Sequence, residues 1–495
     1  MKQPSIQTPR SRPLWPLTIA LAVAAVLSGC AAIPKMSAST VLRTPADFAA
    51  TDSLAAERTD WPKDEWWRQY HDAQLDGLVS EALGNSPTLD IAAARLRGAE
   101  ALTQATGAAL KPTVTGSAAI TEERQSYSYL MPRAATPQGW NDYGQVSLGL
   151  GWDLDFWGKN RAALAAAVTE QRALEVELAQ ARLMLSAAVA LSYSELAHLY
   201  STRDSLEAAV DVRTQTLALV RQRHSQDLLT LETVLQAEAR EAAAEADLKV
   251  IDERIRLQKN ALAALVGAGP DRALAITRPT AAVATPFGLP TNAAVDLLGR
   301  RPDIVAARLR TEVAARHIEQ HKAEFYPSVN LMAVGGFLSL GLDSLAKSGA
   351  SYGSVGPAVS LPIFNTDRLK GQLRGSYAEY DAAAAAYNAA LLNALHEVAD
   401  VVTSRRALDG ELESLQASVR AADEAHRLVS ARYKAELTTY LDVLSAEDVL
   451  LSAKRALADA QSRALALHVV LVRALGGGFE PPATPVLTTT NLVRN

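Results

Sequence analysis

Side chains capable of catalysis or metal binding occur in the sequence, but their spacing suits neither chemistry. The eight histidines form no metal-ligand pattern. The segments HKAEF, from His321, and ALHEVAD, around His396, each lack part of the HExxH zinc signature. No GxSxG turn or phosphate-binding loop is present in the sequence. We therefore expect no catalytic residue, no cofactor and no metal site, and we do not expect an enzyme.

One residue does invite covalent chemistry, and it is Cys30, the only cysteine of the chain. It ends the segment LSGC after a positively charged start and an apolar run over 14–27. Small residues before a cysteine are typical of a lipobox, so residues 1–29 are predicted to be a lipoprotein signal peptide. Lipid, including palmitate, would then be attached to Cys30, and Ala31 after it favours the outer membrane. An ordinary signal peptide with a chance cysteine, or a short anchor, is the alternative.

The elements that follow are predicted to be mostly long helices. Aromatic residues make up 5% of the chain, which favours helices that pack through small side chains. There is no glycine or proline between Gly158 and Gly267, and Gly410 is the only such residue from 376 to 475. A helix over about 159–225 would be roughly 100 Å long. The net charge of −5, without a basic block, gives no indication of a nucleic-acid partner.

The chain contains one plan twice. The segment RHSQDLLTLETVLQAE (223–238) recurs as RYKAELTTYLDVLSAE (432–447), 209 positions later. Upstream, residues 86–114 match residues 301–329 at an offset of 215. Such internal similarity indicates a repeated structural unit. Each half is predicted to hold a short helix, two strands, a long helix, a turn and a medium helix.

Alternation of apolar with polar or small residues predicts four strands. Their expected positions are about 113–120, 143–154, 328–337 and 352–361. One apolar and one polar face fit a membrane barrel with a wet lumen, although a half-buried soluble sheet has the same period. No segment after the N-terminal region has 18 consecutive apolar residues, so the mature chain could cross a membrane only through strands.

Two features fit the membrane pattern less well. Met332 and Val334 fall on the supposed lumen face, and Pro357 removes a donor from a barrel that should have no free edge. Four strands also cannot close a barrel, and an open edge in lipid leaves backbone groups unpaired. Two copies would give eight strands around a filled interior, whereas three copies give twelve, enough for an aqueous lumen. We therefore expect a homotrimer.

Further motifs make the prediction specific. They are WWRQYHDAQLDGLVSEAL (66–83), WDLDFWGKNR (152–161), RRPDIVAARLR (300–310) and the duplicated segment. Together with the lipobox, they resemble the TolC family of outer-membrane efflux channels, in its lipoprotein or NodT-type branch. The resemblance covers about residues 60–476. It implies a mainly α fold with membrane β structure, in which a homotrimeric 12-stranded β-barrel is continuous with a periplasmic α-helical barrel.

The resemblance also implies partners, location and boundaries. A periplasmic adaptor (membrane fusion) protein and an inner-membrane RND-type transporter would complete a tripartite multidrug efflux pump. The channel itself would be a passive duct, lipid-anchored in the outer membrane and extending into the periplasm. The expected segments after the signal peptide are an anchored and equatorial part over 30–85, a first repeat over 86–267, an equatorial linker over 268–300, a second repeat over 301–476 and a tail over 477–495. An equatorial collar would come from about 40–75, 268–292 and the residues after 477.

The duplicated segment is predicted to form the periplasmic tips, near 226–230 and 435–439. The resemblance places adaptor docking there, at Asp227 and Leu228 in the first copy and at Glu436 and Leu437 in the second. Many relatives carry a glycine where this chain has Asp227 and Glu436. A left-handed turn costs little for glycine and more for the longer acid, so either the turn has another shape or the docking contacts differ. The alternative is that the leucines only cap the coil.

Three residues of the second copy match the family's periplasmic aperture. Asp442 would form a ring of three carboxylates that attracts cations, and Ser445 stands where some relatives have a second acid. Tyr433 matches a position that can form a hydrogen bond between coils in the closed state. Thr233 replaces Asp442 in the first copy, so the two tips are unequal. A solvated helix-face acid is the alternative for Asp442.

Two other functions remain open on sequence grounds. A protein-secretion (type I) duct would share the fold, and a tethered periplasmic coiled-coil scaffold would share the helices but have no pore.

Overall fold

The computed structural model describes residues 33–36, 38–49, 52–128, 132–281, 288–362 and 365–481. These residues form two compact units. One comprises the described residues up to Thr40 together with Ala99–Gln171 and Arg310–Ala383, and the other comprises Val41–Gly98, Arg172–Leu309 and the described residues from Ala384 onward. Cys30 and the expected signal peptide lie outside the described residues, as does the end of the expected tail.

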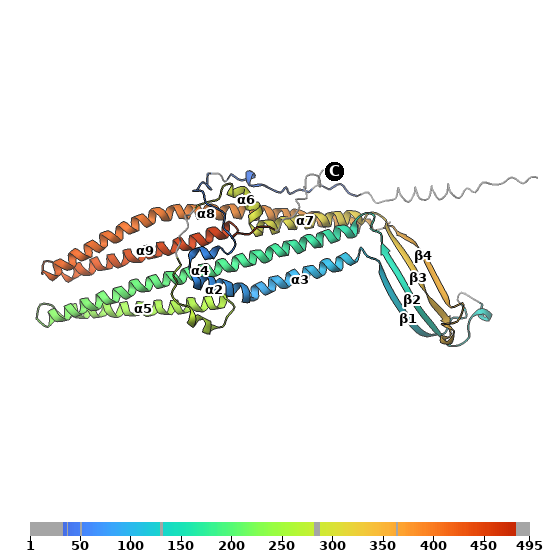
Figure 1. The fold of residues 1–495 in the computed structure, drawn as a ribbon, viewed down its shortest axis with the longest axis horizontal. Coiled ribbons are helices and arrows are strands. Elements are labelled where there is room, and N and C mark those ends of the chain that lie inside the picture. The colour runs from blue at the N-terminus through green and yellow to red at the C-terminus, as the bar shows by residue number, and fades with distance from the viewer. Residues whose placement is uncertain are drawn as a thin grey trace, which may run out of the picture. The chain divides into compact units, whose positions relative to one another are not determined.

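The first unit contains an antiparallel sheet with strand order β1-β2-β3-β4 (Figure 1). Its strands are β1 (Thr113–Glu123), β2 (Asn141–Asp153), β3 (Ser328–Leu340) and β4 (Ser351–Ser360). The predicted strand pairs are therefore present in both halves of the chain. The predicted ends of β1 and β3 were too early, because both strands continue into segments expected to be loops. Backbone pairing persists to Glu123 opposite Asn141, so polar side chains alone do not end a strand.

The motif WDLDFWGKNR joins β2 to the long helix α4 (Lys159–His224). Asp155 has a positive φ of 45°, and its carboxylate accepts hydrogen bonds from the backbone N–H groups of Asn160 at 3.0 Å and Arg161 at 2.9 Å. It thereby satisfies donors that a helix start leaves free. Trp157 stacks on Tyr326 with ring centroids 4.5 Å apart. The motif thus has a structural role in connecting strand and helix.

The second unit is dominated by two helical hairpins, visible in Figure 1, whose long helices begin in the first unit. The first joins α4 to α5 (Leu231–Leu265), and the second joins α8 (Thr366–Lys434) to α9 (Tyr440–Ala474). The absence of glycine and proline predicted the unbroken course of α4. Helix α8 continues through Gly410, because one glycine weakens a helix by about 1 kcal/mol without ending it.

The short helix α2 (Ala73–Asn85) anchors one core of this unit. Asp72 caps α2 by accepting from the N–H groups of Gln74 and Leu75. The same carboxylate accepts from the Tyr193 hydroxyl at 2.8 Å and the Thr280 N–H at 2.7 Å. Around this network lie buried apolar residues that include Trp66, Trp67, Tyr70, Leu78, Leu196, Leu262 and Val469. The motif WWRQYHDAQLDGLVSEAL thus has a structural role, because its residues cap α2 and pack in this core.

The corresponding core of the second half surrounds α6 (Ala293–Arg300) and the start of α7 (Pro302–Ala323), which corresponds to α3 (Pro87–Ala108) in the first half. The buried Arg301 pairs with Asp303 at 2.6 Å and with Glu397 of α8 at 2.7 Å. Its Nη1 also donates to the carbonyl of Ala474 at 3.0 Å. Arg301, in the motif RRPDIVAARLR, therefore holds α7, α8 and the end of α9 together.

Two of the three segments expected to form a collar contact each other. The Leu289 N–H donates to the Glu57 carbonyl at 2.7 Å, and the Thr59 N–H donates to the Leu289 carbonyl at 3.1 Å. Within the described part of the chain, every helix is too short or too polar to cross a membrane.

Candidate functional site at the helical turns

Both hairpins turn through the same backbone motif. The Asp227 N–H donates to the His224 carbonyl at 3.0 Å, and the Leu228 N–H donates to the Arg223 carbonyl at 3.0 Å. Together these bonds make a Schellman cap, which requires a left-handed residue after the helix. Asp227 supplies it, with φ of 59°.

The second turn repeats this arrangement. The Glu436 N–H donates to the Tyr433 carbonyl at 3.1 Å, the Leu437 N–H donates to the Arg432 carbonyl at 2.9 Å, and Glu436 has φ of 62°. The turn therefore keeps its left-handed form although an acid occupies it. Of the two possibilities left by the sequence, a differently shaped turn is the wrong one.

A leucine follows the left-handed residue in each turn and faces solvent. The exposed fraction is 58% for Leu228 and 76% for Leu437. A residue at this position of a Schellman cap commonly packs back on its own helix. Such exposure leaves both side chains available to a partner.

The two turns differ in how the next helix begins. Thr439 caps α9 and forms a capping box with Asp442. One carboxylate oxygen of Asp442 accepts from the Thr439 N–H at 3.0 Å and from the hydroxyls of Thr438 and Thr439, each at 2.6 Å. These hydrogen bonds lower the pKa of Asp442 below its ordinary value. This capping role was not predicted, although the spacing from Thr439 to Asp442 carries the signal.

In the first turn Thr230 has the capping position, and the residue three positions later is Thr233. The Thr230 hydroxyl oxygen accepts from the Thr233 N–H at 3.4 Å, and the two hydroxyls lie 3.1 Å apart. No carboxylate takes part in this cap. The second turn therefore has a carboxylate, that of Asp442, in its helix cap, whereas the first turn has the neutral Thr233 at the same position.

Tyr433 joins the two hairpins. Its ring is buried, and the Arg223 guanidinium carbon lies 4.3 Å from the ring centroid. Arg223 also donates from Nη2 to the Tyr433 carbonyl at 3.1 Å. The ring packs with residues of both hairpins, namely Leu217, Val220, Val234, Tyr440, Val443 and Leu444. Within the described part of the chain the Tyr433 hydroxyl has no hydrogen-bond partner, so the ring and carbonyl make the contact between hairpins.

A second link between the hairpins was not predicted. Glu447 of α9 is 2% exposed and lies 3.4 Å from the Arg213 Nε of α4. Arg213 and Arg240 also approach the two oxygens of Asp448, at 3.4 and 3.3 Å. Burial raises the pKa of the Glu447 carboxyl, and Arg213 opposes this effect.

The sequence did contain a signal for this link, because Glu447 ends the duplicated segment. Its counterpart Glu238, 209 positions earlier, is half-exposed and pairs with Arg221 of its own hairpin at 2.7 Å. The repeat therefore marks the position, and only the packing makes one copy a link between hairpins.

Ser445 lies exposed on α9, beside a groove that Arg240, Leu441, Asp448 and Val449 also line. The hydrogen bonds of Asp442 remain within its own turn. The structure therefore brings Tyr433 against the first hairpin, while Asp442 and Ser445 stay at the surface of the second.

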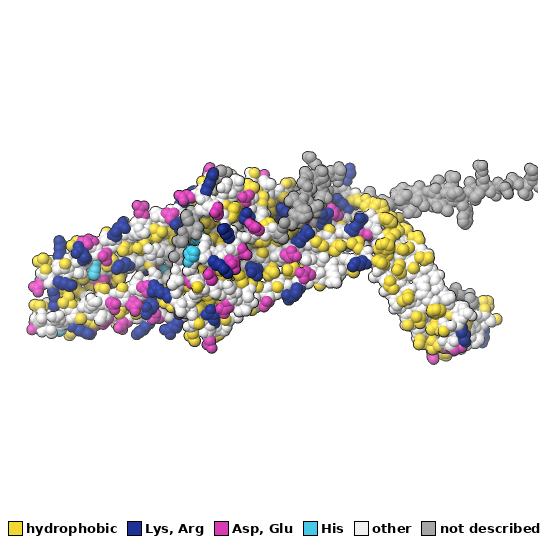
Figure 2. All heavy atoms as spheres, in the orientation of Figure 1, with side chains coloured by type: hydrophobic (Ala, Val, Ile, Leu, Met, Phe, Trp, Pro, Cys, Tyr) yellow, Lys and Arg dark blue, Asp and Glu magenta, His cyan; other side chains and the backbone are white. Residues whose placement is uncertain are grey.

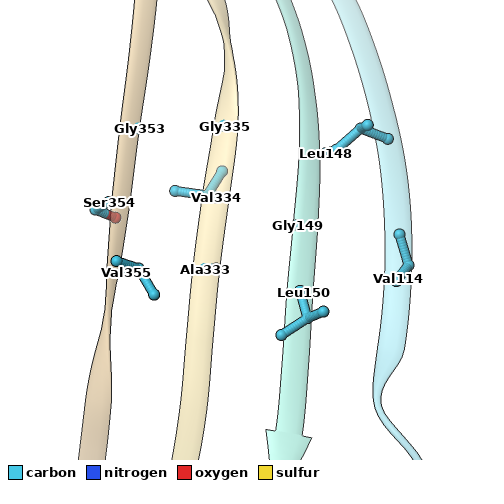
Figure 3. Close-up of a pocket in the computed structure, with 10 residues that line it drawn as sticks. All are labelled: Val114, Leu148, Gly149, Leu150, Ala333, Val334, Gly335, Gly353, Ser354 and Val355. Atoms are coloured by element: carbon cyan, nitrogen blue, oxygen red, sulfur yellow. The ribbon is translucent and has the colours of Figure 1, made fainter.

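The sheet presents two chemically different faces. Val114, Leu150, Ala333 and Val355 are paired across the four strands and so share one face. Figure 3 shows them around a shallow apolar groove that Gly335 and Gly353 also line. Val355 is 78% exposed and Val114 is 66% exposed. Figure 2 shows hydrophobic side chains over the sheet and charges of both signs over the hairpins.

The opposite face is mostly polar. Ser117 and Ser147 share a hydrogen bond of 2.8 Å, and Gln145 donates to the Tyr352 hydroxyl at 3.0 Å. Met332 also lies on this face, as the alternation of apolar and polar residues in the sequence indicated. It is paired with Gly151 of β2 on one side and Gly356 of β4 on the other. Gly336 lies against Val146 and Ser147 so closely that a Cβ would overlap their backbone.

Comparison with known proteins gives consistent matches. The family model described as "Outer membrane efflux protein" matches residues 78–268 and 293–477. The chain is 30% identical over 473 residues to the multidrug resistance outer membrane protein MdtP of Shigella flexneri, which covers 93% of this chain and 96% of the relative. It is 30% identical over 494 residues to the fusaric acid resistance protein FusA of Burkholderia cepacia, with coverage of 96% and 90%.

Solved structures agree with these sequence matches. The outer membrane protein VceC from Vibrio cholerae is 47% identical to this chain and has a TM-score of 0.81. The match covers 85% of this chain and 100% of VceC.

Proposed function

The chain belongs to the outer membrane efflux protein family, and on this premise we propose that three copies form the passive outer-membrane duct of a tripartite efflux pump. That the chain is an outer-membrane efflux component follows from its family and its relatives. The trimer, its anchoring and the roles of individual residues are the proposal.

The observation that carries the proposal is a four-stranded sheet with one apolar face, one polar face and two edge strands. A single copy would leave the backbone groups of β1 and β4 unpaired in lipid, where each such group costs several kcal/mol. Three copies supply twelve strands, and a twelve-stranded barrel encloses an aqueous lumen. The apolar face then meets lipid and the polar face lines the lumen. Lipid on Cys30 would add a second attachment to the outer membrane.

We assign docking of a periplasmic adaptor protein to the two turns. Asp227 with Leu228 and Glu436 with Leu437 present an acid and an exposed leucine in the same backbone motif. Three copies would offer six such turns. The duct itself would be passive and would need no catalytic activity. An inner-membrane RND-type transporter would supply the energy.

We assign the periplasmic aperture to the second turn. Asp442 carries a carboxylate whose lowered pKa favours ionisation, and threefold symmetry would bring three of them around one axis. Ser445, one turn further along α9, would contribute a neutral ring. Tyr433 would hold the second hairpin against the first in the closed state. The equatorial collar would form from residues 40–75 and 268–292 with those after 477, since Glu57 and Leu289 already pair.

The test is complementation in a strain that lacks its own outer-membrane channel but expresses the cognate adaptor and transporter. Restored drug resistance is the expected result. A chain that assembles in the outer membrane as trimers without restoring resistance would contradict the efflux role. Conductance of the purified protein in a planar bilayer gives an independent measurement, because a scaffold without a pore passes no current.

A further inference from the structure

The edge strands of the sheet carry enough information to define how a second copy would pair with them. In an antiparallel sheet, directly opposed residues alternate between hydrogen-bonded and non-hydrogen-bonded pairs. A residue that bonds to the strand on one side therefore leaves its neighbours in sequence to bond on the other side. One known bond consequently determines the direction of every backbone group along a strand.

In β4 the known bond runs from the Leu338 N–H to the Ala350 carbonyl at 2.8 Å. Ala350 therefore faces β3, and the register of this pair continues along the strand. Alternate residues face the open edge with their N–H and C=O groups. These are Ser351, Gly353, Val355, Pro357 and Val359.

In β1 the direction of the backbone N–H and C=O groups follows from the bonds of its neighbour β2. The Leu154 N–H donates to the Val329 carbonyl at 3.0 Å, and the Gly341 N–H donates to the Asp142 carbonyl at 2.8 Å. Even-numbered residues of β2 thus face β3, and odd-numbered ones face β1. The residues of β1 that face the open edge are then Val114, Gly116, Ala118, Ile120 and Glu122.

The internal duplication supplies the register. Thr113 lies opposite Gly151 in the first half. Adding the sequence offsets of 215 and 209 gives Ser328 opposite Ser360, which is the pairing in the second half. The two halves of the sheet therefore repeat each other without slippage.

The same offsets can be applied to the junction between the halves. There Leu150 of β2 lies opposite Ala333 of β3. The equivalent residues are Val359 of β4 and Ala118 of β1. Both residues belong to the sets whose backbone groups face the open edges. The hydrogen-bond directions and the sequence offsets therefore agree on which residues of β4 and β1 would form hydrogen-bonded pairs.

We propose that β4 of one copy pairs antiparallel with β1 of a second copy, with Val359 opposite Ala118 and Pro357 opposite Ile120. The proposal rests on the proposed function, because it specifies the contact by which copies would close the barrel. Pro357 has no N–H, so the Ile120 carbonyl of the neighbouring copy lacks one donor at this contact. The proline that seemed out of place in a closed barrel thus lies on the outer side of β4, where it leaves the pairing with β3 intact.

Cysteine pairs on the polar face test this register. Ala119 would lie opposite Ala358, and Ser117 opposite Ser360, both as non-hydrogen-bonded pairs. Their Cα atoms would be about 4.5 Å apart, which a disulfide can bridge. Exchanging partners gives matched controls from the same four substitutions, since Ala119 with Ser360, or Ser117 with Ala358, would be about 7–8 Å apart.

The full-length protein would be extracted from outer membranes, oxidised and separated by non-reducing electrophoresis, with the single-cysteine variants accounting for Cys30. We expect covalent trimers from Ala119→Cys with Ala358→Cys and from Ser117→Cys with Ser360→Cys, and at least tenfold less from the exchanged pairs. Covalent trimers from an exchanged pair, or none from either matched pair in a protein of trimeric native mass, would overturn the register. A monomeric native mass would instead contradict the proposed function.

Discussion

Arg223 of the first hairpin holds Tyr433 of the second by two contacts at once. Its Nη2 donates to the Tyr433 carbonyl at 3.1 Å, and its guanidinium carbon lies 4.3 Å from the Tyr433 ring centroid. A planar guanidinium can bind a carbonyl and an aromatic face together, whereas an ammonium group cannot do so with the same geometry. The contact between the two hairpins at Tyr433 therefore depends on an arginine here.

Replacement of Arg223 should loosen this contact. We expect Arg223→Ala to lower the free energy of unfolding by about 1–2 kcal/mol and to raise single-channel open probability in planar bilayers. Arg221→Ala is the matched control, because Arg221 pairs with Glu238 inside its own hairpin. Equal open probability in both variants would show that Arg223 does not restrain the hairpins.

Glu447 should give stability a pH dependence. Its folded pKa is raised above the ordinary 4.5, mainly by burial, so the folded protein binds the proton more tightly than the unfolded chain. Stability should therefore fall as pH rises from about 4.5 through the raised pKa. Thermal unfolding across this range should show a difference between wild type and Glu447→Gln of order 1 kcal/mol. Glu238→Gln is the control at the equivalent, half-exposed position, and an identical difference there would refute the assignment.

The exposed leucines of the turns should contribute to adaptor docking. Leu228→Glu with Leu437→Glu is expected to weaken adaptor binding by about tenfold or more, since 1.4 kcal/mol of lost apolar contact corresponds to a factor of ten. Binding can be measured by surface plasmon resonance with the purified adaptor. Leu274→Glu changes another exposed leucine, 84% accessible and outside both turns, and should leave affinity unchanged. Unaltered affinity in the double variant would leave the leucines with no docking role.

Glycine should relieve the left-handed turns. Glu436 has φ of 62°, and a residue with a Cβ loses roughly 1 kcal/mol in that conformation relative to glycine. Glu436→Gly should therefore raise the melting temperature, while Asp227→Gly should raise it less because Asp tolerates the conformation better. If adaptor binding falls at the same time, the acids have a docking role that offsets their conformational cost.

Asp442 combines a cap with a charge, and two substitutions separate them. Asp442→Asn removes the charge but keeps an oxygen that can accept the Thr439 N–H, so we expect reduced cation selectivity with little loss of stability. Asp442→Ala should lose both, including about 1 kcal/mol from the cap. Reversal potentials in a salt gradient and thermal unfolding measure the two effects. Wild-type selectivity in both variants would remove Asp442 from the aperture.

Local patterns in the sequence predicted most of the architecture. The two offsets predicted equivalent halves, and the pairing of Thr113 with Gly151 and of Ser328 with Ser360 follows those offsets. Long segments with few or no glycine and proline residues predicted the long helices. The alternation of apolar with polar or small residues predicted which strand residues share a face. These features depend on residues near one another in the chain, where helical and extended periodicities act directly.

The sequence alone determined the repeated plan, the turns and the two-faced strands, because each is encoded within a short segment. Only the tertiary structure decided what equivalent positions do. Glu238 and Glu447 end the same repeat, yet only Glu447 is buried against the other hairpin. Likewise, only the register of β3 with β4 shows that Pro357 turns its missing donor outward. Burial and pairing depend on which distant segments meet, and no local pattern specifies that.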